Sequence, residues 1–412
     1  MKRFQHLAIS LLLLISFNCF LIAETITKNF DGGKMQCKYS IDKDGKKTGL
    51  YQEYFKNGKL KIKASYKKGE LNGKYSEYDE NGKIKKAFTY KKGLQHGFQK
   101  TYENGKSKSK EVWVSGILAY PKSIKEIKRS LSLIQQIKIQ QTGTWPSDQL
   151  AESNFSPKVI KDNTTGIKKL MEFRFLSDLP YKNIKIDRNQ VAHCIGAVNV
   201  LIKVGKLTHT PKNPGMPEKE FKFGYHGTTH TNLSMGGNVS ASSSVKRYMD
   251  DSDKSNIDRV GHRRWCLNPK LGATGFGNKG SFGAMWSMDS TNKDIPIYDY
   301  IAYPSRGYYP RTHISNKHAW SVSLNPNKYM NGSKDKIKVS VFRLNNKFVK
   351  EKAAMPLEYF NVDNGGFGIK SCIIFLPKKL STAPKSRYFV EITGTKLKDG
   401  SSSKIEYMVE FY

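Results

Sequence analysis

A repeat of 24 residues near the N-terminus constrains the fold of this chain more than any other feature. Glycine and tyrosine each recur three times at that spacing, at Gly49, Gly73, Gly97, Tyr54, Tyr78 and Tyr102. Each unit continues to an Asn-Gly step, at residues 57, 81 and 104, and Asn-Gly supplies the positive φ angles of a two-residue hairpin turn. After the first turn, apolar residues alternate with lysines over residues 59–66, as in a half-buried strand. The repeat therefore predicts three β-hairpins stacked into an elongated sheet.

This pattern resembles the MORN repeat in its variant form, over roughly residues 45–110. The segment holds 18 lysines and six carboxylates, which gives a net charge of +12. That charge has two interpretations: a docking surface for anionic lipid or cell-wall polymer, or a solvated face that keeps a small sheet soluble. If the segment docks, the lysines expected to make the contact are Lys59, Lys61, Lys63, Lys85 and Lys86.

The rest of the chain is also basic. In all, 70 Lys and Arg stand against 35 Asp and Glu, and the net charge of +35 attracts anionic polymers or membrane surfaces. Nucleic acid is not an expected partner, because no recognition motif is present. In addition, the N-terminal residues described next indicate export, and an exported protein rarely meets nucleic acid. A hydrophobic content of 38% excludes wholesale disorder, and 412 residues predict several domains.

Residues 1–23 are typical of a signal peptide. Lys2 and Arg3 precede an apolar stretch over residues 7–15, and Ala23 is a small residue at the expected cleavage point. Two alternatives are a retained membrane anchor and lipidation at Cys19. Cleavage would leave no membrane-spanning segment, so we expect an exported protein in the periplasm, on the cell surface or outside the cell.

The remaining sequence predicts an α+β multidomain protein. After the repeats (24–115), a capping box from Ser123 to Glu126 begins a helical bridge and linker over residues 116–160. Residues 161–315 predict a helix pair, a Gly- and Pro-containing loop, and a third helix ending in acids. Residues 316–412 contain five short alternating runs, which favour an antiparallel, immunoglobulin-like β-sandwich without a nameable site.

The central segment carries an ordered set of motifs. A His-Thr step at His209 is followed by a Gly-x-Asn-Val turn, the acidic helix end and Gly261-His-Arg-Arg-Trp265. In this order the motifs resemble the CAP superfamily (cysteine-rich secretory, antigen 5 and pathogenesis-related-1 proteins, also called SCP-like), in its bacterial form. The resemblance implies an α-β-α sandwich whose cleft is lined by two histidines and two acids. It assigns His209, His262 and Asp251 to three of those positions, while the fourth is Gly237 and lacks a carboxylate.

These three residues allow more than one chemistry. His209 and His262 could ligate a divalent cation such as Zn²⁺, or the histidines and Asp251 could act as acid and base. They could also only form hydrogen bonds that stabilise the cleft. No strained-turn motif singles out a nucleophilic serine. We therefore expect the cleft to bind a lipid, glycan or other small ligand without turnover; the alternative is a peptidase or cell-wall hydrolase, with or without a metal.

The cysteines do not define a framework. Cys37, Cys194, Cys266 and Cys372 remain after signal cleavage, and they have no CxxC spacing. Cys194 falls on the apolar face of a predicted helix, where a buried free thiol is the simple interpretation. A Cys194–Cys266 disulfide is possible, and the sequence alone does not decide whether it forms.

Overall fold

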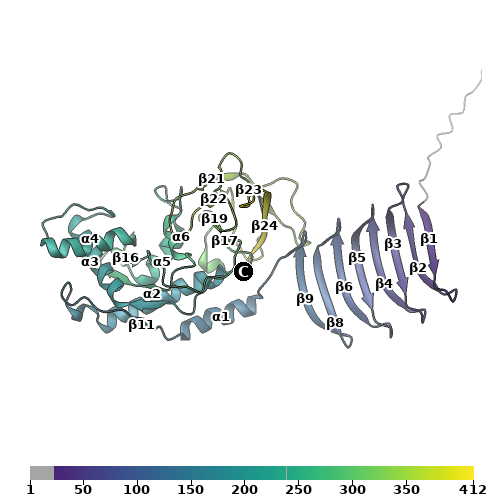
Figure 1. Cartoon of the computed structure of the whole chain (residues 1–412), viewed down its shortest axis with the longest axis horizontal. Helices are drawn as coiled ribbons and strands as arrows, with labels where there is room; N and C mark the ends of the chain where they lie inside the picture. The colour runs from purple at the N-terminus through teal and green to yellow at the C-terminus, as the bar shows by residue number, and fades with distance from the viewer. Residues whose placement is uncertain (1–22, 238) are drawn as a thin grey trace, which may run out of the picture. The chain divides into compact units, whose positions relative to one another are not determined.

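The computed structural model describes residues 23–237 and 239–412. The chain divides into two compact units, Met1–Gly116 and Ile117–Tyr412 (Figure 1). The expected signal peptide lies outside the described residues except for Ala23. None of the helices in these two stretches has the length and apolar character needed to cross a membrane.

The first unit is one antiparallel sheet made of consecutive hairpins. Its strands are β1 (Glu24–Asn29), β2 (Met35–Ile41), β3 (Lys47–Tyr54), β4 (Leu60–Lys67), β5 (Glu70–Tyr78), β6 (Ile84–Lys91), β7 (Leu94–Gln95), β8 (Gly97–Glu103) and β9 (Lys106–Val114). The hairpins β3–β4, β5–β6 and β8–β9 correspond to the three predicted units. A further hairpin, β1–β2, precedes them, and its turn at Gly33 lacks the asparagine that marks the repeat.

The hairpin turns differ from the expected two-residue form in the first two units. Only the glycine has a positive φ there, +81° at Gly58 and +84° at Gly82. The Gly58 amide donates to the Phe55 carbonyl at 2.8 Å, so a type I turn is followed by a left-handed glycine. The third Asn-Gly comes one residue early, and this shorter loop has the two-residue form, with φ of 50° at Asn104 and 76° at Gly105.

Strand register places two different sets of side chains on the two faces of this sheet. Directly paired residues of antiparallel strands share a face. One cross-strand row therefore contains Lys38, Gln52, Lys63, Ser76, Ala87, Lys100 and Lys110. Lys74, two residues before Ser76, lies on the same side. We call this surface, defined by Lys38, Lys63, Lys74, Lys100 and Lys110, the lysine face.

The opposite face, which we call the tyrosine face, carries aromatic rings from five strands. They belong to Tyr39, Tyr51, Tyr66, Tyr75, Phe88 and Tyr90. Ring centroids of neighbours lie 5.7 to 6.3 Å apart, and Ala64 among them is only 1% exposed. Because the sheet is a single layer, this ring ladder provides the packing that a second layer would otherwise give.

In the second unit, helices cover both faces of a three-stranded antiparallel sheet, β13–β16–β15 (Figure 1). The helices are α1 (Ile124–Gln136), α2 (Pro157–Leu176), α3 (Arg188–Val204), α4 (Glu218–His230), α5 (Ala241–Asp250) and α6 (Gly261–Cys266), and the strands are β13 (Thr231–Met235), β15 (Phe276–Lys279) and β16 (Phe282–Trp286). Cys194 and Leu201 of α3 pack with Leu233 and Ala284 on one face. On the other face, Ser244 of α5 contacts Ser234, with 2.9 Å between their hydroxyl oxygens.

Helix α4 lies where the sequence predicted a loop with several Gly and Pro residues. Its glycines are required by packing: a Cβ on Gly224 would lie 2.6 Å from the Gly196 carbonyl oxygen, and one on Gly227 would lie 2.1 Å from the His193 oxygen. The two helices α3 and α4 therefore pack backbone to backbone. Glycine here allows close approach and does not break the helix.

The smaller elements complete the connections. The expected capping box is present at α1, where the Ser123 hydroxyl accepts from the Glu126 amide at 3.2 Å. The parallel pairs β11–β12 and β12–β14 join Gln141–Thr142, Lys185–Asp187 and Ala273–Thr274. The remaining short elements are β10 (Ile117–Leu118) and the 3₁₀ turns Glu152–Asn154 and Arg311–His313.

Two four-stranded sheets form the C-terminal part of this unit. The first is β17 (Tyr300–Tyr303), β19 (Trp320–Leu324), β22 (Cys372–Pro377) and β21 (Leu357–Asp363); the second is β18 (Gly307–Tyr309), β24 (Ser402–Phe411), β23 (Arg387–Lys396) and β20 (Lys338–Arg343). The sheets pack face to face around Trp320, whose ring centroid lies 5.8 Å from Tyr388 and 6.2 Å from Phe411.

Two features of these sheets differ from the sequence-based expectation. Strands β17 and β18 lie before residue 316, where the sequence predicted no strand of the β-sandwich. They did not stand out in the sequence because prolines at 304 and 310 leave only short runs. The β18–β24 pair is parallel, so the second sheet is mixed and not purely antiparallel. One hydrophobic core extends from Ile127 in α1 to Phe411 in β24, across the expected boundary at 315/316.

Candidate functional site

His209 and His262 line one cavity of about 320 Å³ in the second unit. His209 lies in the segment between α3 and α4, and His262 is the second residue of α6. Asn232 of β13 and Trp265 of α6 add to the lining. The structure thus brings together two residues that are 53 positions apart in the sequence.

Asp251 is not among the residues that line this cavity, but it forms a hydrogen bond with His262, which does line it. It follows α5 in a left-handed conformation, with φ of 46°, and its side chain is only 1% exposed. Its Oδ1 lies 2.8 Å from Nδ1 of His262, and its Oδ2 accepts the Arg263 amide at 3.3 Å. With Nδ1 donating to the carboxylate, the neutral ring has its lone pair on Nε2.

His209 is oriented by a main-chain acceptor. Its Nδ1 lies 2.7 Å from the Thr228 carbonyl oxygen, and the Thr228 hydroxyl donates back to the His209 carbonyl at 3.0 Å. Nε2 is therefore the acceptor nitrogen of this ring also. Desolvation at the cavity rim, together with the neighbouring His262 and Arg259, lowers the pKa of His209. At neutral pH the ring is uncharged and accepts hydrogen bonds.

The described residues supply an incomplete set of metal ligands. Two imidazoles held through Nδ1 are arranged as in metal sites, where the second ring nitrogen commonly donates to a carbonyl or carboxylate. Catalytic zinc, however, uses three protein ligands. Asp251 is engaged by His262 and Arg263, and position 237 is a glycine. Within residues 23–237 and 239–412, no group of three His, Cys, Asp or Glu is placed to hold a metal ion.

Buried arginines hold α6 in place beside the cavity. Arg263 donates to the carbonyls of Met249 and Ala319, each at 2.8 Å, and to the Ser321 hydroxyl at 3.0 Å. Its guanidinium lies 4.4 Å from the centre of the Tyr303 ring. Arg263 therefore ties α5, α6 and strand β19 together, which fixes His262 against Asp251.

Sequence reasoning missed one wall of the cavity. Gly366 and Phe367, from the loop between β21 and β22, line it together with the two histidines. No site could be named in this segment from the sequence. The contact joins segments more than 100 residues apart, and no local sequence signal indicates it.

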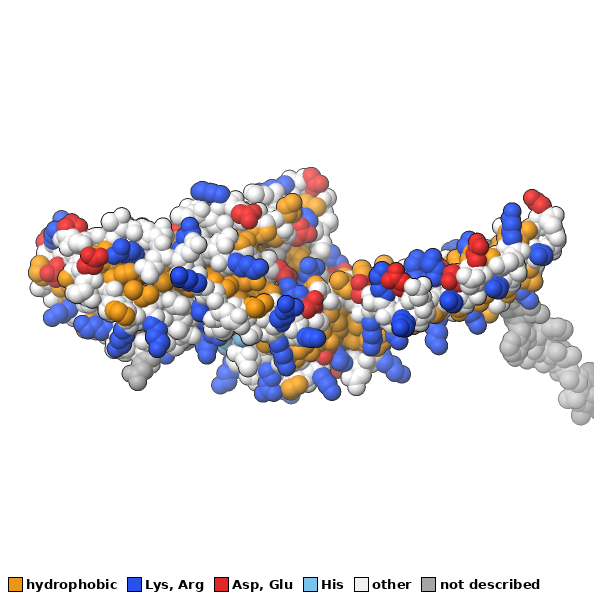
Figure 2. Space-filling model, turned by 90° about the horizontal axis from the view of Figure 1, so that it is seen from below, with side chains coloured by type: hydrophobic (Ala, Val, Ile, Leu, Met, Phe, Trp, Pro, Cys, Tyr) orange, Lys and Arg blue, Asp and Glu red, His pale blue; other side chains and the backbone are white. Residues whose placement is uncertain are grey.

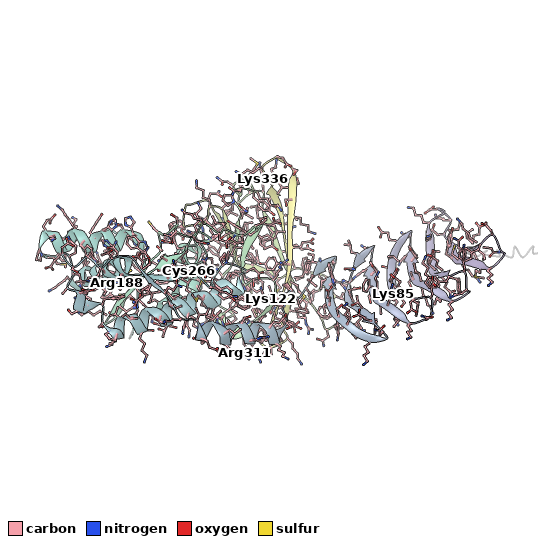
Figure 3. All side chains as sticks on the ribbon, turned by 60° about the horizontal axis from the view of Figure 1, so that its bottom comes forward. Lys85, Lys122, Arg188, Cys266, Arg311 and Lys336 are labelled. Carbon is pink, nitrogen blue, oxygen red and sulfur yellow. The ribbon has the colours of Figure 1, made fainter. Side chains whose placement is uncertain are left out.

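The cysteines of the described chain are all free and buried. Cys194 donates to the Gly275 carbonyl oxygen at 3.2 Å, and Cys266 lies inside the second unit (Figure 3). Burial raises the pKa of both thiols. Neither the Cys194–Cys266 bridge nor any other disulfide is formed among the described residues.

The five lysines expected to dock occupy different environments in the repeat sheet. Lys61 and Lys86 are ion-paired with Glu53 and Glu77, at 2.7 and 2.8 Å. Lys63 belongs to the lysine face, Lys59 is exposed in a turn, and Lys85 is exposed at a β-bulge (Figure 3). Lysine side chains outnumber carboxylates over the visible part of the array (Figure 2).

Charge is thus divided between the two faces of the sheet. Glu53 and Glu77 lie on the tyrosine face, where they accept from Tyr51 and Tyr75 at 3.0 and 3.4 Å. Burial and the Glu77 charge raise the pKa of Tyr75 to about 12. By contrast, no lysine of the lysine face has an ion-pair partner among the described residues.

Comparison with known proteins identifies part of the first unit. Residues 47–68 and 71–92 each match the MORN repeat variant. The MORN-variant prediction is therefore confirmed over these two units, and the third predicted unit lies beyond the matched residues. No curated protein and no solved structure matches the chain.

Proposed function

We propose that this is an exported binding protein that attaches to an anionic envelope surface through the lysine face and holds a small ligand in the His209–His262 cavity. The MORN-variant repeats suit a binding protein in general. A CAP-like identity of the central segment is part of this proposal. It is supported by the motif order and by the proximity of His209, His262 and Asp251.

The observation that carries the attachment is the separation of charge across a single-layer sheet. Lys61 and Lys86 are neutralised by Glu53 and Glu77 of the tyrosine face, and Lys47 packs over the tyrosine rings, whereas the lysines of the lysine face have no ion-pair partners among the described residues. Four of the five lysines that define the lysine face are exposed, and Lys100 is half-buried. A face that served only for solubility would not need this sorting, because exposed ion pairs would serve equally well.

The spacing of the lysine face suits an extended anionic surface. Adjacent strands are ~4.8 Å apart, so Lys38 on β2 and Lys63 on β4 are separated by roughly 10 Å. Lys100 and Lys110 are direct cross-strand partners. Such a row offers several weak contacts at once, and their combined attraction decreases as salt shortens the Debye length.

The test is co-sedimentation of the mature protein with purified sacculi and with phosphatidylglycerol vesicles, at low and high salt. A lysine-face variant changes Lys38, Lys63, Lys74 and Lys110 to Glu. A matched control makes the same change at four exposed lysines of the second unit, Lys203, Lys206, Lys212 and Lys317. The two variants have equal net charge, so only the place of the charge differs.

We expect the lysine-face variant to lose at least tenfold in attachment at low salt and to lose its salt dependence. The control variant should retain most of the attachment and most of its salt dependence. Equal losses of attachment in the two variants would mean that net charge alone drives attachment, and would contradict a specific role for the lysine face. Retention on sacculi alone or on vesicles alone would identify the anionic partner as polymer or lipid.

One observation favours a second candidate function. The Asp251–His262 hydrogen bond is the arrangement by which a carboxylate orients a general base. A hydrolase would also need a nucleophile or an activated water at His262 Nε2, and no described Ser, Thr or Cys bonds to that atom. Turnover of peptide or cell-wall substrates, abolished by His262→Ala in a folded protein, would favour this candidate. Repeating the assay with added Zn²⁺ would test metal assistance.

A further inference from the structure

The loop that closes the cavity comes from the C-terminal sheets. We call residues 364–371, between β21 and β22, the clamp loop. Its Gly366 and Phe367 line the cavity that also contains His209, His262 and Trp265. The C-terminal sheets therefore contribute directly to the ligand cavity.

A buried arginine fixes this loop on α6. Arg264 is 1% exposed, and its Nε donates to the Ile369 carbonyl at 3.0 Å. Its guanidinium also pairs with Asp363 and with the Gly365 carbonyl oxygen, and lies 5.2 Å from the centre of the Phe367 ring. These contacts hold both ends of the clamp loop and the ring between them.

Two glycines allow the loop to approach α6 closely. A Cβ on Gly261 would lie 2.9 Å from Cδ1 of Phe367. At Gly368, where φ is +73°, a Cβ would lie 2.9 Å from Cε3 of Trp265. Any larger residue would displace a ring, so the positions of Phe367 and Trp265 in the cavity are set before a ligand arrives.

The lining combines apolar side chains with hydrogen-bond acceptors. Trp265, Phe367 and Met288 are its large apolar side chains, and the two imidazoles provide acceptors. None of the described lining residues is acidic. The one arginine, Arg259, is already bonded to Asp258, to the Ser255 carbonyl and to Asn256, at 2.9 to 3.1 Å.

We propose that the clamp loop makes this cavity a site for a neutral carbohydrate, with a sugar ring against Phe367 and Trp265 and its hydroxyls donating to His209 and His262. This inference rests on the proposed role of the cavity as a ligand site. Aromatic walls with a few placed polar groups are typical of small-molecule pockets, and the lack of unpaired charge disfavours an ionic ligand. A fatty acid would leave both imidazoles without donors along its chain.

The test is titration of the full mature chain with N-acetylglucosamine tetramer and with cellotetraose, followed by saturation-transfer NMR and calorimetry. Phe367→Ala removes the ring, and Phe367→Tyr keeps it. Phe98→Ala is the matched control, because Phe98 is an exposed phenylalanine of the first unit, 47% exposed. Thermal unfolding of each variant reports whether it is folded.

We expect one of the two sugars to bind, with at least a tenfold loss in Phe367→Ala and near wild-type affinity in Phe367→Tyr and Phe98→Ala. Absence of binding by both sugars, or binding that Phe367→Ala leaves unchanged, would overturn the proposal. If Phe367→Ala does not fold, loss of affinity in Phe367→Leu with retention in Phe367→Tyr decides instead. The lysine-face variant should bind sugar normally, so failure of surface attachment and failure of this inference are separate results.

Discussion

Asp251 and His262 meet between the end of α5 and the start of α6, with 2.8 Å between Oδ1 and Nδ1. The carboxylate is almost fully buried, and its second oxygen accepts the Arg263 amide. The pair therefore has two functions in the molecule: it orients an imidazole in the cavity, and it satisfies a main-chain donor at the N-terminus of a short helix.

Asp251→Ala is expected to lower the free energy of unfolding by on the order of 3 kcal/mol, because it leaves buried donors unpaired and places alanine at positive φ. Asp251→Asn keeps one acceptor and tolerates the backbone, so its loss should be smaller, about 1–2 kcal/mol. Urea unfolding of both variants measures the difference. An alanine variant as stable as wild type would mean that the two hydrogen bonds contribute nothing net.

Replacing Arg263 by lysine should destabilise the protein even though the charge is retained. A single ammonium cannot reproduce the fork that reaches Met249, Ala319 and Ser321, and the loss should be about 3 kcal/mol or more. The control is Arg311→Lys, at an exposed position, where we expect a change within ~0.5 kcal/mol. Equal midpoints for the two variants in thermal unfolding would contradict this role of Arg263.

Stability should decrease in mild acid because of His193. Its ring stacks on Phe223 and lies 4.7 Å from His226 and 5.6 Å from Trp286, between ring centres. Burial and the neighbouring His226 lower the pKa of His193 to about 4. The unfolded chain therefore takes up a proton near pH 6.5 that the folded chain resists, so stability decreases as pH falls from about 6.5 towards about 4.

The matched variant for this effect is His193→Phe, which keeps a ring against Phe223 and cannot be protonated. After allowance for solvent screening, we expect wild type to lose on the order of 1 kcal/mol more than the variant between pH 7.5 and pH 5. Chemical denaturation at the two pH values measures this difference. Parallel losses would assign the acid sensitivity to other groups, among them His226 on α4, whose pKa is also lowered by burial.

The thiols should react in order of local opening. Cys194, Cys266 and Cys372 are 0% exposed, and burial raises the pKa of each. Cys37 is 8% exposed and lies in the single-layer sheet. We expect a chain lacking residues 1–23 to show one fast and three slow cysteines with a thiol reagent, and four fast ones in denaturant. Modification of Cys194 before Cys37 in the native state would contradict the helix packing described for α3.

Gly58 should be difficult to replace, and Gly32 should not. Both are open to solvent on the Cβ side, but only Gly58 has a left-handed φ, +81°. Gly58→Ala is expected to cost about 1 kcal/mol, whereas Gly32→Ala should be neutral or slightly stabilising. Hydrogen exchange of the β3 and β4 amides reports the effect locally. Unchanged exchange in Gly58→Ala would mean that the turn relaxes.

Parts of this architecture follow from local sequence. The 24-residue spacing predicted the hairpins, and Ser123 with Glu126 predicted the start of α1. The lysine and tyrosine faces were harder to predict from the sequence. Alternation over residues 59–66 shows that the strand has two different faces, but it does not show whether a second layer covers one of them. The bulge at Lys61 further moves Leu60 to the face opposite Ile62.

The candidate site was only half accessible to such reasoning. His209, Asp251 and His262 could be named from motifs, and the structure places the two histidines in one cavity. Phe367 could not be named, because its position depends on Arg264 and on the absence of side chains at Gly261 and Gly368. Helix α4 was missed for a related reason, since glycine in close helix packing has the same sequence signal as glycine in a loop.

The hairpin array also determines how such a protein can change over evolutionary time. Each further 24-residue unit would add two strands, roughly 10 Å of length, without altering the packing of units already present. Gain or loss of a single unit would then change the length of the array in fixed steps. A lineage could therefore lengthen or shorten the array by gaining or losing repeats, while the unit that follows is inherited unaltered.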